Sequence, residues 1–143
     1  MDDAVKTLFE RYEALFNQAL GGKDDMEAVA ALYAEEFIGA APMGVRAGKN
    51  DAEFRAALAA GYAHYRAIGT REMRIKGVQT TPIDALHCLA KVSWTSLYDR
   101  KDGAEIRIDF EVHYLVHMQD GAARVFGWIT GDESAALREH GLI

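Results

Sequence analysis

The chain has 143 residues, of which half are apolar and 27% are charged, and its net charge is −6. This length and composition are those of one folded globular domain with its own core, rather than of a disordered chain, so we expect a single domain over residues 1–143. The negative charge argues against nucleic acid as a partner, because binding phosphates requires Lys and Arg gathered on one face.

The N-terminal region predicts two helices. From Asp3 to Leu20, apolar residues recur every three or four positions, and two glycines then end the pattern. This first segment is acidic and amphipathic, which is not the pattern of a secretory signal. Asp24 or Asp25 can cap a short second helix. Its expected buried stripe comprises Met26, Val29, Ala30, Leu32 and Tyr33.

Residues 36–50, with the sequence EFIGAAPMGVRAGKN, are too rich in glycine and too interrupted by Pro42 for a long element. They predict a short strand and a loop. The Gly-Lys pair lacks the flanking residues of a phosphate-binding loop, and we expect Arg46 to be solvated or salt-bridged. A third helix should follow, capped by Asn50 or Asp51 and ending near Gly69. Its apolar side would carry Phe54, Leu58, Tyr62 and Tyr65.

After Gly69 the apolar period changes from 3.6 to 2, which indicates strands. Four extended runs are predicted: Thr70–Thr80, Leu86–Tyr98, Ala104–Met118 and Arg124–Thr130. Short turn segments join them, so neighbouring strands should be antiparallel. The single cysteine, Cys88, lies on an apolar parity and is expected to be a small buried side chain. The tail can form a last helical turn capped by Asp132 or Ser134.

The strand Ile106–Met118 separates its side chains by parity. One parity is wholly apolar, and the other carries Arg107, Asp109, Glu111, His113, Leu115 and His117. The apolar side should lie under the helices, because exposing it would create a large sticky patch. Histidines two positions apart are separated by roughly 7 Å along a strand, so we expect no metal site on the polar side.

The order of elements, together with RYEALFN, ALYAEEF and PMGVRAGKNDAEFRA, resembles the nuclear transport factor 2-like superfamily, and its SnoaL-like members most of all. The resemblance covers almost the whole chain. It implies an α+β fold in which about three N-terminal helices pack on a curved, mostly antiparallel sheet to form a cone around a pocket. It also implies a homodimer through the outer face of the sheet.

Ketosteroid isomerase, an enzyme of this superfamily, uses a general base and an oxyanion hole formed by a tyrosine and a protonated aspartic acid. RYEALFN resembles its first-helix motif and places Tyr12 at the tyrosine. The base, an Asp before a Pro in that enzyme, corresponds here to Ala41 before Pro42, and alanine cannot accept a proton. The second acid corresponds to Leu115 or Tyr114. Tyr12 is therefore more readily interpreted as a core residue.

The residues expected to face inward are mostly aromatic, which suits a small apolar or aromatic ligand. The candidate ligand-binding residues are Tyr12, Phe16, Phe37, Phe54, Tyr62, Trp94, Tyr98, Phe110 and Tyr114. The same residues could instead fill the core and leave no cavity, and the sequence leaves open which face Phe126 and Trp128 occupy.

The sequence favours a ligand-binding protein, and we expect no cofactor or metal. No run approaches the ~20 apolar residues of a membrane span, so we also expect no membrane contact and a location in the cytoplasm. The alternative is a SnoaL-like isomerase, cyclase or dehydratase that uses general acid and base chemistry on a hydrophobic substrate. No catalytic residue can be named. Glu36, Asp109 and His113 are the titratable residues whose position relative to a cavity would decide between the two.

Overall fold

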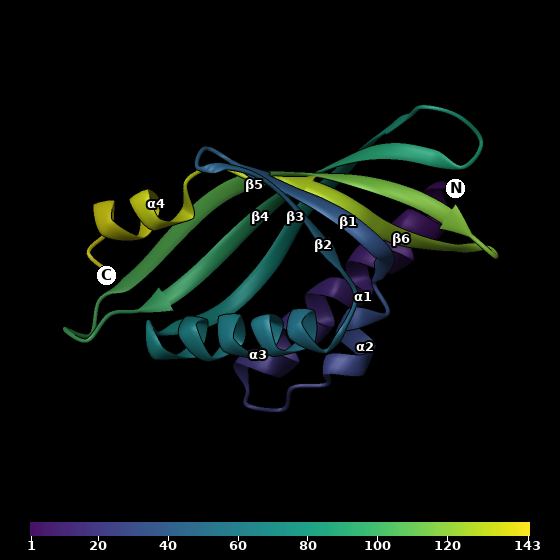
Figure 1. Cartoon of the computed structure of the whole chain (residues 1–143). Coiled ribbons are helices and arrows are strands. Elements are labelled where there is room, and N and C mark those ends of the chain that lie inside the picture. Colours follow the sequence, from purple (N-terminus) through teal and green to yellow (C-terminus); the bar gives the residue numbers. More distant parts are fainter.

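The computed structural model describes all residues from 1 to 143 and contains four helices and six strands (Figure 1). In chain order, the elements are α1 (Asp2–Leu20), α2 (Met26–Ala30), β1 (Tyr33–Ala41), β2 (Gly44–Lys49), α3 (Ala52–Ala67), β3 (Thr70–Pro82), β4 (His87–Asp99), β5 (Glu105–Gln119), β6 (Ala122–Ile129) and α4 (Glu133–Glu139).

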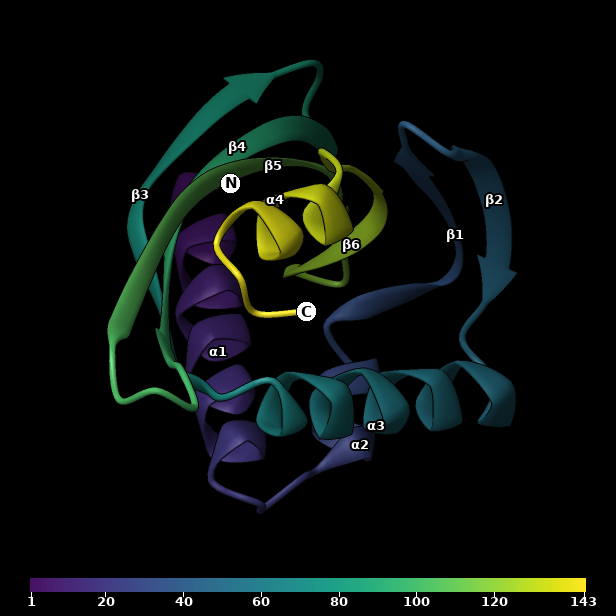
Figure 2. The same cartoon turned by 90° about the vertical axis from the view of Figure 1, so that its left-hand side faces the viewer.

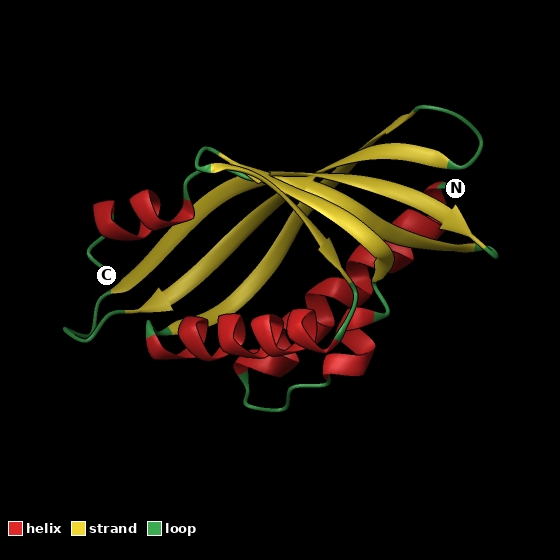
Figure 3. Ribbon diagram, viewed as in Figure 1, coloured by secondary structure: helices red, strands yellow, loops and turns green.

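The strands form one curved sheet in the order β2-β1-β6-β5-β4-β3. Every neighbouring pair is antiparallel except β1 and β6, which are parallel. Figure 2 shows the sheet curving around α1, with α3 across the open side and α4 at one end. The α+β cone predicted from the sequence is therefore confirmed (Figure 3). No helix combines the length and the apolar character needed to cross a membrane.

Helix α1 is fastened to the edge strand β3 by side chains. Asn17 both donates to the carbonyl oxygen of Met73 (2.8 Å) and accepts from its amide (2.9 Å), and Glu13 accepts from the amide of Ile75. These bonds occupy main-chain groups that an edge strand otherwise leaves open to pairing with another chain. Asp25, Asp51 and Asp132 cap α2, α3 and α4.

The predicted inward and outward parities of β5 are confirmed. Ile108, Val112, Tyr114 and Val116 are buried, whereas Arg107, Asp109 and Glu111 are exposed. On β4, the residues from Cys88 to Tyr98 on the inward parity are likewise buried. Burial raises the pKa of the Cys88 thiol, which agrees with the expected inert side chain.

The prediction of a loop after β1 is wrong, because the segment forms a second strand. β1 and β2 make an antiparallel hairpin joined by Pro42 and Met43, where proline is placed outside the ladder and needs no hydrogen-bond donor. The stripe predicted for the second helix is also too long. Helix α2 ends at Ala30, and Tyr33 is the first residue of β1. Ala30 and Tyr33 are nevertheless both buried, as predicted.

A β-bulge on β6 decides the faces of Phe126 and Trp128. Leu115 pairs with Gly127 and the next residue, Val116, pairs with Val125, so Phe126 is the extra residue. Trp128 pairs with Tyr114 and lies inside the cone, whereas Phe126 packs edge-on against His87 on the outer face. Simple alternation would have placed both aromatic residues on one face, which is why the sequence could not assign them.

Candidate functional site

A hollow of about 230 Å³ lies inside the cone, between α1 and the sheet. Its walls are apolar and aromatic except for one threonine, and they comprise Tyr12, Phe16, Tyr33, Met73, Trp94, Phe110, Val112, Tyr114, Trp128 and Thr130. We call this hollow the inner pocket. The aromatic rings contact one another at centroid distances of 5.6 Å for Tyr12 with Trp94 and 5.9 Å for Tyr12 with Tyr114. The cone therefore holds a cavity and is not filled by its own core.

Three tyrosine hydroxyls are the main polar groups of the inner pocket. The Tyr33 hydroxyl donates to that of Tyr12 over 3.4 Å, which leaves the Tyr12 proton free to be donated elsewhere. Burial raises the pKa values of Tyr12, Tyr33 and Tyr114, because a buried phenolate would lose its hydration. At neutral pH these groups are therefore hydrogen-bonding phenols and not bases.

A second hollow, of about 250 Å³, lies beside the inner pocket at the end covered by α4. The two share Met73, Phe110, Val112 and Thr130 as lining residues. The second hollow adds three acidic residues that the inner pocket lacks, namely Asp132, Glu133 and Glu111, and the Glu111 carboxylate lies 3.4 Å from Lys91.

The carboxylates of Asp132 and Glu133, at the start of α4, differ in their availability to a ligand. Asp132 accepts from the amide of Ala135 as the cap of α4 (2.9 Å). Glu133 forms no ion pair. After burial, its negative charge and then its hydrogen bond with the Tyr65 hydroxyl raise the pKa of Tyr65.

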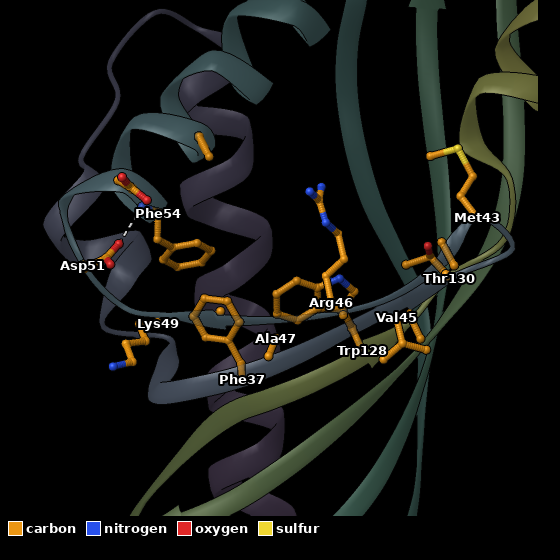
Figure 4. A pocket seen from close by; sticks show the side chains of 17 residues that line it. Phe37, Met43, Val45, Arg46, Ala47, Lys49, Asp51, Phe54, Trp128 and Thr130 are labelled. Carbon is orange, nitrogen blue, oxygen red and sulfur yellow. Dashed lines mark hydrogen bonds between the residues drawn. The ribbon is translucent and has the colours of Figure 1, made fainter.

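A third and wider hollow, of about 820 Å³, opens between the β1–β2 hairpin and α3 (Figure 4). We call it the outer hollow. Phe37, Phe54 and Trp128 form an aromatic floor, with ring centroids 4.5 Å apart for Phe37 and Phe54 and 5.3 Å apart for Phe37 and Trp128. Trp128 lines both the outer hollow and the inner pocket, and Thr130 lines all three hollows. The three hollows therefore meet at the end of β6.

The structure distributes the predicted ligand-binding residues over all three hollows. Tyr12, Phe16, Trp94, Phe110 and Tyr114 line the inner pocket. Tyr98 lines the second hollow, and Phe37 and Phe54 line the outer one. Tyr62 lines none of them, because it is buried edge-on against Phe16 in the core.

The positions that correspond to ketosteroid isomerase catalysts carry no acid. Ala41 ends β1, and the inward residue of the Tyr114–Leu115 pair is Tyr114. The titratable residues singled out from the sequence do not border the inner pocket: Asp109 bonds to Thr95 and Arg107 on the outer face, His113 lies on the same face, and Glu36 is exposed on β1. No cluster of three His, Cys, Asp or Glu side chains is arranged to hold a metal ion.

The structure also adds site residues that the sequence did not single out, namely Tyr33, Met73, Trp128, Thr130 and Glu133. The sequence pattern places Tyr33 on the second helix and does not indicate which face of the sheet Trp128 occupies. Thr130 and Glu133 follow the last strand, where the end of β6 turns into α4. Their position beside the pocket depends on where α4 packs, which no local pattern indicates.

Comparison with known proteins agrees with this geometry. A family model described as NTF2-like protein (DUF6841) matches residues 2–133. No curated protein matches the sequence.

Solved structures show the same fold. An NTF-2 like protein of unknown function from Shewanella oneidensis is 16% identical with a TM-score of 0.68, and the match covers 92% of this chain and 98% of that one. An NTF2-like protein with a cystatin-like fold from Novosphingobium aromaticivorans is 18% identical (TM-score 0.67; 96% and 86% covered). A ketosteroid isomerase-like protein from Erwinia carotovora atroseptica is 16% identical (TM-score 0.63; 90% and 93% covered).

At these identities the solved structures establish the fold and leave the activity open. The family match spans residues 2–133, which is nearly the whole chain. These residues include the entire six-stranded sheet and all residues that line the inner pocket. The chain therefore belongs to the NTF2-like family.

Proposed function

We propose that this protein binds a small apolar or aromatic molecule in the inner pocket. The observation that carries this proposal is the lining itself, in which nine of ten residues are hydrophobic and five carry tyrosine or tryptophan rings. An aromatic ligand would replace water along these walls and pack against rings already positioned by the fold. Tyr12 supplies a hydroxyl that can orient one polar group of the ligand.

Binding is favoured over catalysis because the inner pocket contains no group that exchanges protons near neutral pH. General acid and base catalysis is most effective with a pKa close to the working pH. The buried tyrosines have pKa values displaced further from neutrality, and no carboxylate or imidazole lines the pocket.

A second candidate function rests on Glu133. Its carboxylate borders the hollow adjoining the inner pocket and makes no ion pair, so it could accept a proton from a substrate that extends past Phe110. This would restore the enzymatic alternative, with a base in a different place from the Ala41 position. Turnover that is lost in Glu133→Gln while ligand affinity is retained would support it.

The binding proposal is tested by thermal unfolding with the uncharged probe biphenyl-4-ylmethanol. A ligand that binds only the folded state raises the melting temperature, and we expect a rise of several degrees. Trp94→Ala should abolish the rise. Thr130→Phe should also abolish it, by filling the junction of the hollows without removing a core ring. Leu89→Ala, on the outer parity of β4, should leave it unchanged. Stabilisation by polar metabolites alone would contradict the proposal.

We also propose that two copies associate through the outer face of the sheet. Ile38, Leu89, Leu115 and Ile129 form an outer apolar patch, in which Ile38 and Leu115 both lie over Gly127 and Leu89 pairs with Leu115. Lys91 and Glu111 lie on the same face, 3.4 Å apart. A face that carries positive and negative side chains around an apolar centre can pair with its own copy about a two-fold axis.

A further inference from the structure

The outer hollow contains one inward cation, Arg46, supplied by strand β2. Side chains of a strand alternate between its faces. On the parity of Arg46 the other β2 residues are Gly44 and Gly48, so Arg46 is the only residue of this parity on β2 that has a side chain. Figure 4 shows its guanidinium extending into the space between the hairpin and α3.

Arg46 continues a row of residues that crosses the sheet. It pairs with Gly39 on β1, Gly39 pairs with Trp128 on β6, and Trp128 pairs with Tyr114 on β5. Neighbouring strands lie about 4.8 Å apart, so the row places Arg46 roughly 10 Å from Trp128 and roughly 14 Å from Tyr114, measured between backbones. Gly39 has no side chain and the Trp128 indole lies against its backbone, so no other side chain of the row stands between the indole and Arg46.

The guanidinium of Arg46 has no ion-pair partner within the protein. Two acids also line the hollow, Asp51 and Glu53. The Asp51 carboxylate accepts from the amide of Phe54 as the cap of α3 (3.0 Å), and Glu53 lies in the first turn of that helix. Lys49 is the remaining cation, and it lies on the opposite parity of β2 from Arg46.

We propose that the ligand of the inner pocket is an elongated aromatic carboxylate whose anionic end is bound by Arg46. This inference rests on the proposed function and adds the chemical class of the ligand. The guanidinium offers paired donors that match a carboxylate. The aromatic body lies along the floor of Phe37 and Trp128, and its far end enters the inner pocket toward Tyr114.

The test compares biphenyl-4-carboxylate with the uncharged biphenyl-4-ylmethanol by titration calorimetry. In the wild-type protein we expect the carboxylate to bind about tenfold more tightly, which is the ratio expected for one charge-assisted contact. Arg46→Gln should reduce this ratio to about one without changing the affinity for the alcohol. Lys49→Gln is the matched control on the other face of the same strand and should keep the ratio. Benzoate, which is too short to span the row, should bind more weakly than biphenyl-4-carboxylate.

The outcomes separate the two proposals. Equal affinity for the two biphenyl compounds in the wild-type protein would overturn the carboxylate inference and leave the apolar pocket standing. Equal losses of both compounds in Arg46→Gln, or a ratio lowered to the same extent by Lys49→Gln, would also overturn it. Binding of neither compound would contradict the proposed function as well.

Discussion

The indole of Trp128 lies directly against the backbone of Gly39, its register partner on β1. A Cβ atom at position 39 would lie 2.9 Å from atoms of the indole ring. We therefore expect Gly39→Ala to displace the indole and to lower the free energy of unfolding by about 1–3 kcal/mol, as overpacking does. Denaturant unfolding measures the loss, and a shift in tryptophan emission should accompany it.

Gly61→Ala provides the comparison for this prediction. Gly61 lies inside α3, and nothing comes within 4 Å of a Cβ built there. Alanine should stabilise the helix by about 0.5–1 kcal/mol, because glycine loses more backbone freedom on folding. A Gly39→Ala variant as stable as the wild-type protein would show that the indole has room to move.

Adjacent residues on β5 should respond oppositely to substitution. Val112 is 6% exposed and faces the pocket, whereas Glu111 is exposed and lies 3.4 Å from Lys91. Val112→Asp should unfold the protein, because an unpaired buried charge costs several kcal/mol, and Glu111→Ala should change stability by less than about 0.5 kcal/mol. Circular dichroism and denaturant unfolding compare the two. Similar tolerance at both positions would contradict the assigned faces.

All six tyrosines should resist ionisation while the protein remains folded. Burial raises the pKa of Tyr12, Tyr33, Tyr62, Tyr65, Tyr98 and Tyr114. A raised pKa means that the folded state is stabilised below the unfolded value of about 10 and loses that stabilisation as pH rises above it. Tyrosinate absorbance should therefore appear together with unfolding in an alkaline titration. In guanidinium chloride it should appear near pH 10, and the same midpoint without denaturant would refute the prediction.

Asp109 should stabilise the protein at neutral pH and cease to do so in acid. The Thr95 hydroxyl, which donates to Asp109 over 2.6 Å, and then Arg107 lower the pKa of this carboxyl to about 2. Because the pKa is lowered from an unfolded value near 3.9, the stabilisation is present above that value and is lost as pH falls toward 2. Asp109→Asn should therefore be less stable than wild type at pH 7. Curves of stability against pH that stay parallel down to pH 2 would contradict this assignment.

The proposed homodimer should depend on the centre of the outer apolar patch. Sedimentation velocity at micromolar concentration should give a species of twice the 15.8 kDa chain mass. Leu115→Lys should give the monomer, because it places a charge opposite its own copy at a two-fold contact. Lys101→Glu, in the β4–β5 turn away from the patch, should remain dimeric. A monomeric wild-type protein would remove the proposal.

The sequence predicted those parts of the fold that depend on local periodicity. The β5 parity and the cap at Asp51 were recognisable because each depends on residues close together in the chain. The Phe126 bulge and strand β2 were missed, since both depend on what a strand pairs with. The row from Arg46 to Tyr114 crosses four strands, so no sequence pattern could reveal it.

The parallel pairing of β1 with β6 restricts the order in which the protein can fold. Tyr33 pairs with Val125 and Ala40 pairs with Ile129, so this part of the sheet joins residues about ninety positions apart. Contacts of such long sequence separation are slow to form, because the loop between them must close first. During synthesis, the β1–β2 hairpin has no neighbour in the sheet until β6 has left the ribosome. Chains truncated before Ala122 should therefore expose the β1 edge and aggregate, a vulnerability that the finished protein does not share.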